Sequence, residues 1–303
     1  MAITIDDIDT GGTSAAPPPR RRSRLRGLLR AVVAVVAAAG LVLAGLFVWE
    51  EMMGTEQLEA SAPTETQLQE FAGVRVFFGH QSVGDNILAG LRAFDDTSAT
   101  NLRIIDGAPS AEATGGFVAE FHAGINGDPQ SKIDAFAAAL AASPAGAFDV
   151  ALLKFCYVDV TANTDVRTVV ETYMAAIADL QRQYPDITFL YATVPLTTGR
   201  DLKRTIKSWI GRDEGNGPED NRIRQVFNAT LRDRLAGTGL LFDIAAVQAA
   251  VDQSTTTVRG EGDGRYYVMH DAYASDPGHL NALGSSAAAT EFIRVVIGAA
   301  ERG

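Results

Sequence analysis

The sequence predicts a doubly wound α/β domain, in which helices cover both faces of a parallel sheet. Five short, nearly all-apolar runs fit strands that are buried on both sides. Stretches with helical spacing of apolar residues alternate with these runs between residues 74 and 300. This alternation indicates a three-layer α/β/α, flavodoxin-like domain with a parallel sheet of about five strands.

Each expected element follows from a local pattern. The apolar runs that predict strands are residues 74–79, 102–107, 149–155, 187–195 and 239–244. The amphipathic stretches that predict helices are residues 85–94, 131–142, 164–184, 221–235 and 282–300. In the longest, residues 164–184, Val166, Val170, Tyr173 and Ile177 fall on one stripe, as expected of a helix that packs on a sheet.

The N-terminal part of the chain has a different composition. Residues 31–49 form an uncharged apolar stretch that as a helix would rise about 28 Å, enough to cross a bilayer. An arginine-rich segment precedes it, which favours a cytoplasmic N-terminus. We therefore expect a disordered basic cytoplasmic tail (1–27), a transmembrane signal anchor (28–50), a stalk (51–71) and an extracytoplasmic domain (72–303), held at the cell membrane by a single pass. Ala60-Ser61-Ala62 resembles a signal-peptidase site but lies well beyond the apolar stretch, which favours an uncleaved anchor.

Charge and cysteine content exclude several classes of protein. The net charge of −11 disfavours a nucleic-acid partner, because phosphate binding needs a basic surface. The single cysteine, Cys156, excludes an intrachain disulfide and a cysteine-rich zinc site. Neither a Walker A motif nor G-x-G-x-x-G follows an expected strand, which disfavours nucleotide binding.

Two motifs at opposite ends of the domain carry nucleophile chemistry. His80-Gln81-Ser82 follows the first strand, and Asp276-Pro-Gly-His279 precedes the last helix. A serine hydroxyl becomes an effective nucleophile when a histidine accepts its proton and a carboxylate fixes the tautomer of that histidine. We therefore predict Ser82 as the nucleophile, His279 as the base and Asp276 as the carboxylate that orients it.

These motifs resemble the SGNH hydrolase superfamily, which includes the GDSL esterases and lipases. GHQSVG with Ser82, INGDP with Gly127 and DPGHLN match three of the four family blocks, over about residues 72–300. CYVD (156–159) aligns with the remaining Gly-x-Asn-Asp block and puts Val158 in the place of the asparagine. The resemblance implies a divergent serine hydrolase that cleaves ester bonds without a metal or another cofactor. Together with the expected anchor, it predicts a membrane-anchored ester hydrolase.

An ester hydrolase also needs donors for the developing oxyanion. The candidates are the backbone N–H groups of Ser82 and Gly127, and the side-chain amide of Asn126, which offers the donor that Val158 lacks. Further side chains that could line the site are His80, Gln81, Lys154, Tyr157 and Asp159. Lys154 and Asp159 could instead form a structural ion pair.

The substrate and two alternative functions stay open. An extracytoplasmic position favours small-molecule, glycan or lipid esters, including O-acyl groups of envelope carbohydrates. Residues 197–222 form a polar insertion beyond the fourth strand, in which Trp209 could stack on a sugar ring, or which could be a solvated flap. Val158 favours a non-catalytic binding domain on the same scaffold. A metal-dependent hydrolase would draw its ligands from His80, His122, His270, His279, Asp271 and Asp276, although no His-x-x-x-His spacing supports it.

Overall fold

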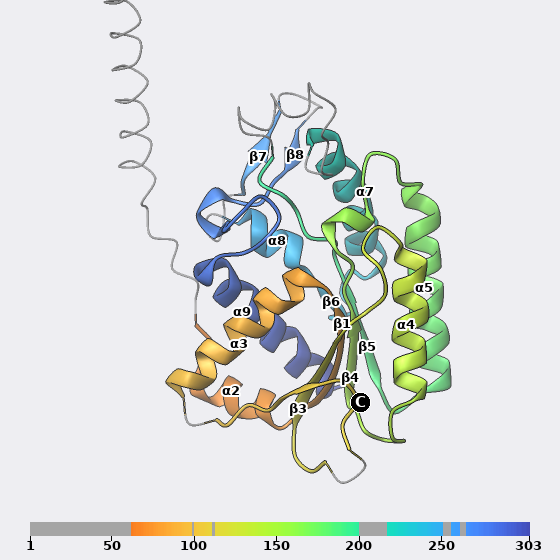
Figure 1. Ribbon diagram of the computed structural model, residues 1–303, viewed down its shortest axis with the longest axis vertical. Helices are drawn as coiled ribbons and strands as arrows, with labels where there is room; N and C mark the ends of the chain where they lie inside the picture. Colours follow the sequence, from red (N-terminus) through yellow and green to blue (C-terminus); the bar gives the residue numbers. More distant parts are fainter. Residues whose placement is uncertain (1–61, 99, 111–112, 200–216, 251–255, 261–264) are drawn as a thin grey trace, which may run out of the picture. The chain divides into compact units, whose positions relative to one another are not determined.

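A computed structural model describes residues 62–98, 100–110, 113–199, 217–250, 256–260 and 265–303 (Figure 1). The predicted cytoplasmic tail, the predicted anchor at residues 28–50, residues 51–61 of the predicted stalk and Trp209 lie outside the described residues.

The centre of the domain is a six-stranded, fully parallel sheet with strand order β2-β3-β1-β4-β5-β6. Its strands are β1 (Arg75–His80), β2 (Ile104–Asp106), β3 (Phe117–His122), β4 (Val150–Leu153), β5 (Thr188–Ala192) and β6 (Leu241–Phe242). The predicted α/β fold with a parallel sheet is confirmed. Because β1 lies inside the sheet with β3 on one side and β4 on the other, its carboxyl end faces a switch point of the topology, where open α/β sheets form crevices.

Helices cover both faces of the sheet (Figure 1). One core contains side chains of α2 (Glu65–Ala72), α3 (Ser82–Thr97), α8 (Ile244–Ala249) and α9 (Ala282–Ala300). The other contains side chains of α4 (Pro129–Ala141), α5 (Val166–Gln183) and α7 (Pro218–Arg234). The short helices η1 (Tyr157–Asp159) and η3 (Asp271–Tyr273) and the hairpin of β7 (Val258–Arg259) and β8 (Tyr266–Tyr267) complete the described elements.

Strand β1 shows why the apolar runs have no polar face. Val76 and Phe78 belong to the core under α3 and α9, whereas Phe77 belongs to the core under α4. Successive side chains of a strand point to opposite faces. A strand covered on both faces is therefore apolar throughout.

Strand β3 was not predicted, and the sheet has six strands where about five were expected. No element was predicted for residues 117–122. They form a strand between β2 and β1, with His122 beside His80 in the register. Glu120 and His122 interrupt the apolar pattern of this segment, because only its first half, Phe117 to Ala119, is buried.

Helix α2 shortens the predicted stalk. Residues 65–72 were assigned mostly to the stalk, but Thr64 and Gln67 form a capping box that begins a helix there. Leu68 and Phe71 are buried, and the ring of Phe71 meets that of Phe292 on α9 edge-on at 6.0 Å. Residues 65–72 are therefore part of the folded domain.

Helix α9 is the one helix of the described ranges that is long and apolar enough to cross a membrane. Half of that stretch is buried inside the domain. Gly90 of α3 lies so close to α9 that a Cβ at this position would overlap the backbone of Ser285. The apolar residues of α9 therefore form core contacts within the domain.

Candidate active site

Three side chains from distant parts of the sequence meet beyond the carboxyl end of β1. Ser82 is the first residue of α3, directly after β1, and Asp276 and His279 lie in the loop before α9. Ser82 Oγ is 2.9 Å from His279 Nε2, and His279 Nδ1 is 2.9 and 2.8 Å from the two carboxylate oxygens of Asp276. The three residues thus form one continuous chain of hydrogen bonds.

The Asp276 carboxylate sets the direction of these hydrogen bonds. Burial alone would raise the pKa of Asp276, but hydrogen bonds from the N–H of Gly278 and from His279 outweigh it and hold the pKa below its ordinary value. An ionised carboxylate only accepts hydrogen bonds, so His279 Nδ1–H donates to it. In the neutral ring this tautomer leaves the lone pair on His279 Nε2, which accepts the hydrogen bond from the Ser82 hydroxyl.

Asn86 ties the serine helix to the histidine loop. It lies four residues after Ser82 on the same face of α3, and its Oδ1 accepts the N–H of Leu280 at 3.0 Å. On the other side of the loop, the N–H of Thr198 donates to the carbonyl of Pro277 at 3.0 Å. Asn86 was not predicted, although its i+4 spacing from Ser82 was a usable signal.

Tyr157, a predicted lining residue, packs against this loop. A Cβ at Gly278 would overlap its ring, which meets His279 edge-on at 6.0 Å. The carbonyl of Tyr157 accepts a hydrogen bond from Nε of Arg224, a buried side chain on α7, at 2.9 Å. Nothing in the sequence distinguishes Arg224 from the other arginines of its helix.

The three oxyanion candidates differ in how the structure places their donors. Ser82 N–H belongs to the first turn of α3, where helix N–H groups have no partner inside the helix. Gly127 N–H already donates to Asp159 Oδ1 at 2.7 Å, so it is not available as an oxyanion donor, contrary to the expectation. Asn126 is exposed, and its Oδ1 accepts from Lys132 Nζ at 2.9 Å, which directs the amide N–H groups away from Lys132.

A buried ion pair holds the loop of Asn126 and Gly127 against the turn that begins at Cys156. Lys132 and Asp159 pair with each other, and both side chains have no exposed surface. Asp159 also accepts from the N–H of Cys156. The suggested pair of Lys154 with Asp159 is therefore not the one that forms. Lys154 is fully buried, its Nζ donates to the carbonyl of Phe155 at 3.1 Å, and burial lowers its pKa to about 8.

His80 and Gln81 support the turn that carries Ser82. Gln81 Nε2 donates to the carbonyls of Ala123 and Gly124, both at 3.0 Å, and so links this turn to the loop after β3. His80 is fully buried and contacts Glu120. Of the predicted lining residues, His80, Lys154 and Asp159 are therefore buried and do not line an accessible surface.

The ligands of the alternative metal-dependent hydrolase do not converge on one site. His279 and Asp276 are bonded to each other. His270 Nδ1 accepts the N–H of Ala272, and Asp271 pairs with Arg259 at 3.4 Å. In the described residues, no three of these six side chains lie close enough together to share one ion.

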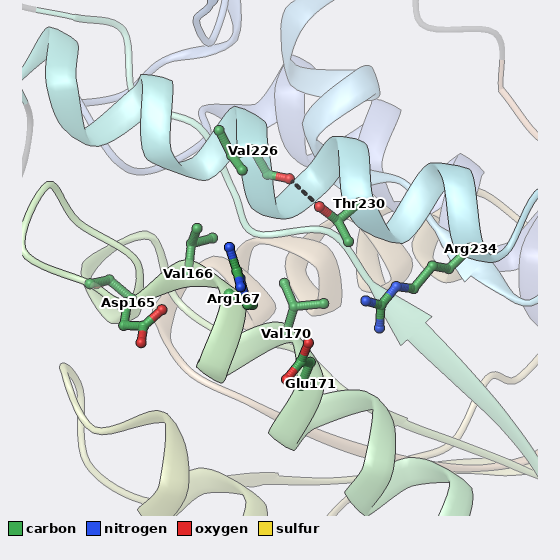
Figure 2. Close-up of a pocket in the computed structure, with 9 residues that line it drawn as sticks. Asp165, Val166, Arg167, Val170, Glu171, Val226, Thr230 and Arg234 are labelled. Atoms are coloured by element: carbon green, nitrogen blue, oxygen red, sulfur yellow. Dashed lines mark hydrogen bonds between the residues drawn. The ribbon is translucent and has the colours of Figure 1, made fainter.

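A separate pocket lies between α5 and α7 and contains none of the candidate residues (Figure 2). It has a volume of about 880 Å³, and its lining combines apolar side chains such as Val170 and Val226 with charged ones such as Arg167 and Glu171.

Comparison with known proteins gives similarity to solved structures alone. No family model matches the chain, and no curated protein matches it. A Streptococcus pneumonia protein assigned as a platelet activating factor is 14% identical, over 86% of this chain and 99% of that one, with a TM-score of 0.45. A Bacteroides fragilis protein assigned as an acylhydrolase is 13% identical, over 80% and 91%, with a TM-score of 0.45. A member of the lipolytic protein G-D-S-L family from Veillonella parvula is 15% identical, over 73% and 96%, with a TM-score of 0.40. Likenesses at this level say nothing of activity.

Proposed function

We propose that the chain is a serine hydrolase of the SGNH type that cleaves ester bonds, with Ser82, His279 and Asp276 as its catalytic residues. One observation carries the proposal: the hydrogen-bond chain from Ser82 Oγ through the His279 ring to the Asp276 carboxylate. Ser82 and His279 are both partly exposed, so a substrate can reach the hydroxyl.

The reaction proceeds in two steps. Ser82 Oγ attacks the ester carbonyl carbon while its proton passes to His279 Nε2, and Asp276 stabilises the resulting imidazolium. The imidazolium then protonates the leaving alcohol, which departs and leaves an acyl group on Ser82. In the second step His279 takes a proton from water, the hydroxide oxygen attacks the acyl carbon, and the acid leaves as the proton returns to Ser82. The Ser82 N–H and the Asn126 amide stabilise the oxyanion in both steps.

A fluorophosphonate probe tests this proposal in the full chain. The probe forms a covalent bond with an activated serine, so peptide mass spectrometry should find it on Ser82. Ser82→Ala should abolish the label, whereas Ser275→Ala, in the loop beside Asp276, should keep it. A wild-type protein without label, or a label that survives Ser82→Ala, would contradict the proposal and favour the non-catalytic binding domain.

The proposal extends to location and substrate. Residues 28–50 anchor the chain with the N-terminus in the cytoplasm, and the domain outside acts on lipid esters or on O-acyl groups of envelope carbohydrates. The apolar stretch and the arginines before it support the anchor. A reporter fused after Gly303 should work only if it is active outside the cytoplasm, and cytoplasmic reporter activity would refute this topology.

A further inference from the structure

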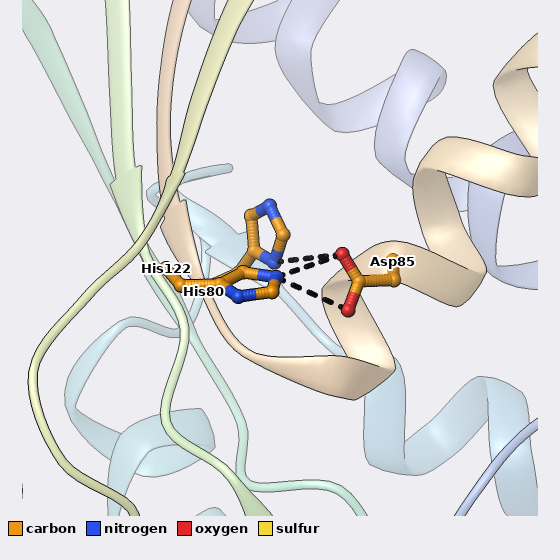
Figure 3. Close-up of side chains that lie close together, drawn as sticks. All are labelled: His80, Asp85 and His122. Carbon is orange, nitrogen blue, oxygen red and sulfur yellow. Dashed lines mark hydrogen bonds and ion pairs between the residues drawn. The ribbon is translucent and has the colours of Figure 1, made fainter. Parts of the chain in front are cut away.

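A second group of chemically active side chains lies behind the turn that carries Ser82. His80 and His122 end the neighbouring parallel strands β1 and β3 and are partners in the register. Asp85, in the first turn of α3, points toward both rings (Figure 3). Its carboxylate oxygens are 2.9 and 3.2 Å from His122 Nε2, and Oδ1 is 4.0 Å from His80 Nδ1. The three groups offer donor atoms that all lie within 4.8 Å of one another.

His80 is held rigidly in this group. It has no exposed surface, and a Cβ at Gly84 would overlap its ring, so the ring lies flat against the first turn of α3. Its Nε2 lies 3.0 Å from Glu120 Oε2 on β3. Histidines that bind a metal through one ring nitrogen usually donate the other N–H to a carboxylate, which fixes the ring and its tautomer. Glu120 has this relation to His80, which leaves Nδ1 directed toward Asp85.

Two hydrogen-bond acceptors, the Gln81 carbonyl and the Asp85 carboxylate, lie near His80 Nδ1. When Nε2–H donates to Glu120, Nδ1 carries a lone pair that faces the carbonyl of Gln81 at 3.2 Å and the Asp85 carboxylate at 4.0 Å. A cation bound between Nδ1 and the carboxylate would satisfy these acceptors.

We propose that His80 Nδ1, His122 Nε2 and Asp85 form a binding site for Zn²⁺. Two imidazoles and one carboxylate suit a transition metal and do not suit Ca²⁺ or Mg²⁺, which prefer all-oxygen sites. Zn–N distances of about 2.0–2.1 Å place tetrahedral ligand atoms about 3.4 Å apart. The Asp85 carboxylate lies 2.9 Å from His122 Nε2 and 4.0 Å from His80 Nδ1, so small side-chain movements would bring the three donors to this spacing. His80 is the fixed ligand, and the half-exposed side chains of Asp85 and His122 close onto the ion.

This site is distinct from the serine chemistry, which uses no metal. The ion would join β1, β3 and the first turn of α3, and so brace the turn on which Ser82 lies. Its binding does not require Ser82 to react, so Ser82→Ala should bind Zn²⁺ as the wild type does. Failure of the metal site and failure of the proposed hydrolase are therefore separable.

Isothermal titration of the metal-stripped full chain with Zn²⁺ tests the site. Wild type should bind one ion, and Ca²⁺ should give no signal. His122→Ala and Asp85→Asn should lose this binding, and both change exposed side chains, so circular dichroism should show an intact fold. Glu120→Gln should weaken binding about 10- to 100-fold because the ring of His80 loses its orienting carboxylate. Asp96→Asn, an exposed aspartate of the same helix, is the matched control and should bind normally.

Two outcomes would overturn the site. A wild type that gives no Zn²⁺ isotherm would show that His122 and Asp85 form only a surface ion pair. Stoichiometric binding that persists in both His122→Ala and Asp85→Asn would place the ion elsewhere on the chain.

Discussion

Lys132 allows a quantitative test of how the candidate site is supported. Its ammonium pairs with the Asp159 carboxylate where neither side chain has exposed surface, and it also holds the Asn126 side chain. Lys132→Met keeps the length of the side chain but leaves the carboxylate without its cation. Removing one partner of a buried pair costs about 3–5 kcal/mol. Asp159 retains the N–H groups of Gly127 and Cys156, so we expect about 3 kcal/mol, the lower end of that range.

The double variant Lys132→Met/Asp159→Asn provides the control. The neutral amide oxygen can still accept from these N–H groups, and no charge stays buried without a partner, so this variant should be more stable than Lys132→Met alone. Equilibrium urea unfolding of the full chain, followed by circular dichroism, measures both. A Lys132→Met variant within about 0.5 kcal/mol of wild type, or a double variant less stable than the single one, would refute the reasoning.

Three further variants test other parts of the account. Lys154→Met should stabilise the domain at pH 7 by up to about 3 kcal/mol. The pKa of Lys154 is about 8 in the folded state against an ordinary 10.5, so the unfolded state holds the proton more tightly between these values. Wild-type stability should then rise as the pH increases from about 8 to 10, and a Lys154→Met variant with the same rise would contradict this assignment. With an activated ester as substrate, Asn126→Ala should lower kcat about 10²-fold and leave KM unchanged. Gln130→Ala is the control and should keep the wild-type kcat. An Asn126→Ala variant with wild-type kcat would remove Asn126 from the oxyanion site. Gly84→Ala should cost about 1–3 kcal/mol or more in urea unfolding because its Cβ overlaps His80, whereas Gly298→Ala, with no atom within 4 Å of its Cβ, should be neutral or stabilising.

The layered fold was predictable because burial on both faces leaves a clear pattern. Runs such as Val76-Phe77-Phe78 have side chains in both cores. A strand with one face in water would instead alternate apolar and polar residues. Strand β3 was missed for the opposite reason. Its second half carries Glu120 and His122 to the surface end of the sheet, where they bond to His80 and Asp85. At this strand end, hydrogen-bonded polar side chains replace the apolar residues by which strands are recognised.

The serine, histidine and aspartate of the site were predictable because the motifs that carry them flank a strand end and a helix start. The supporting residues were not, because their partners are distant in the sequence. Lys132 and Asp159 are 27 residues apart, and Asn86 and Leu280 are 194 apart. Lys154 was suggested as the partner of Asp159 because the two are close in the sequence. In the fold, Lys132 on α4 is the residue that pairs with the Asp159 carboxylate.

Hydrolysis of an activated ester by Ser82→Ala, His279→Ala and their double variant tests the central claim most directly. The three catalytic residues act as one unit, so each single substitution should abolish nearly all turnover, and the double variant should lose little more. Asp276→Asn should be severe but milder, because the base stays present without its orienting carboxylate. A folded Ser82→Ala variant with wild-type hydrolysis would contradict the account and show that Ser82 is only a residue of a polar turn.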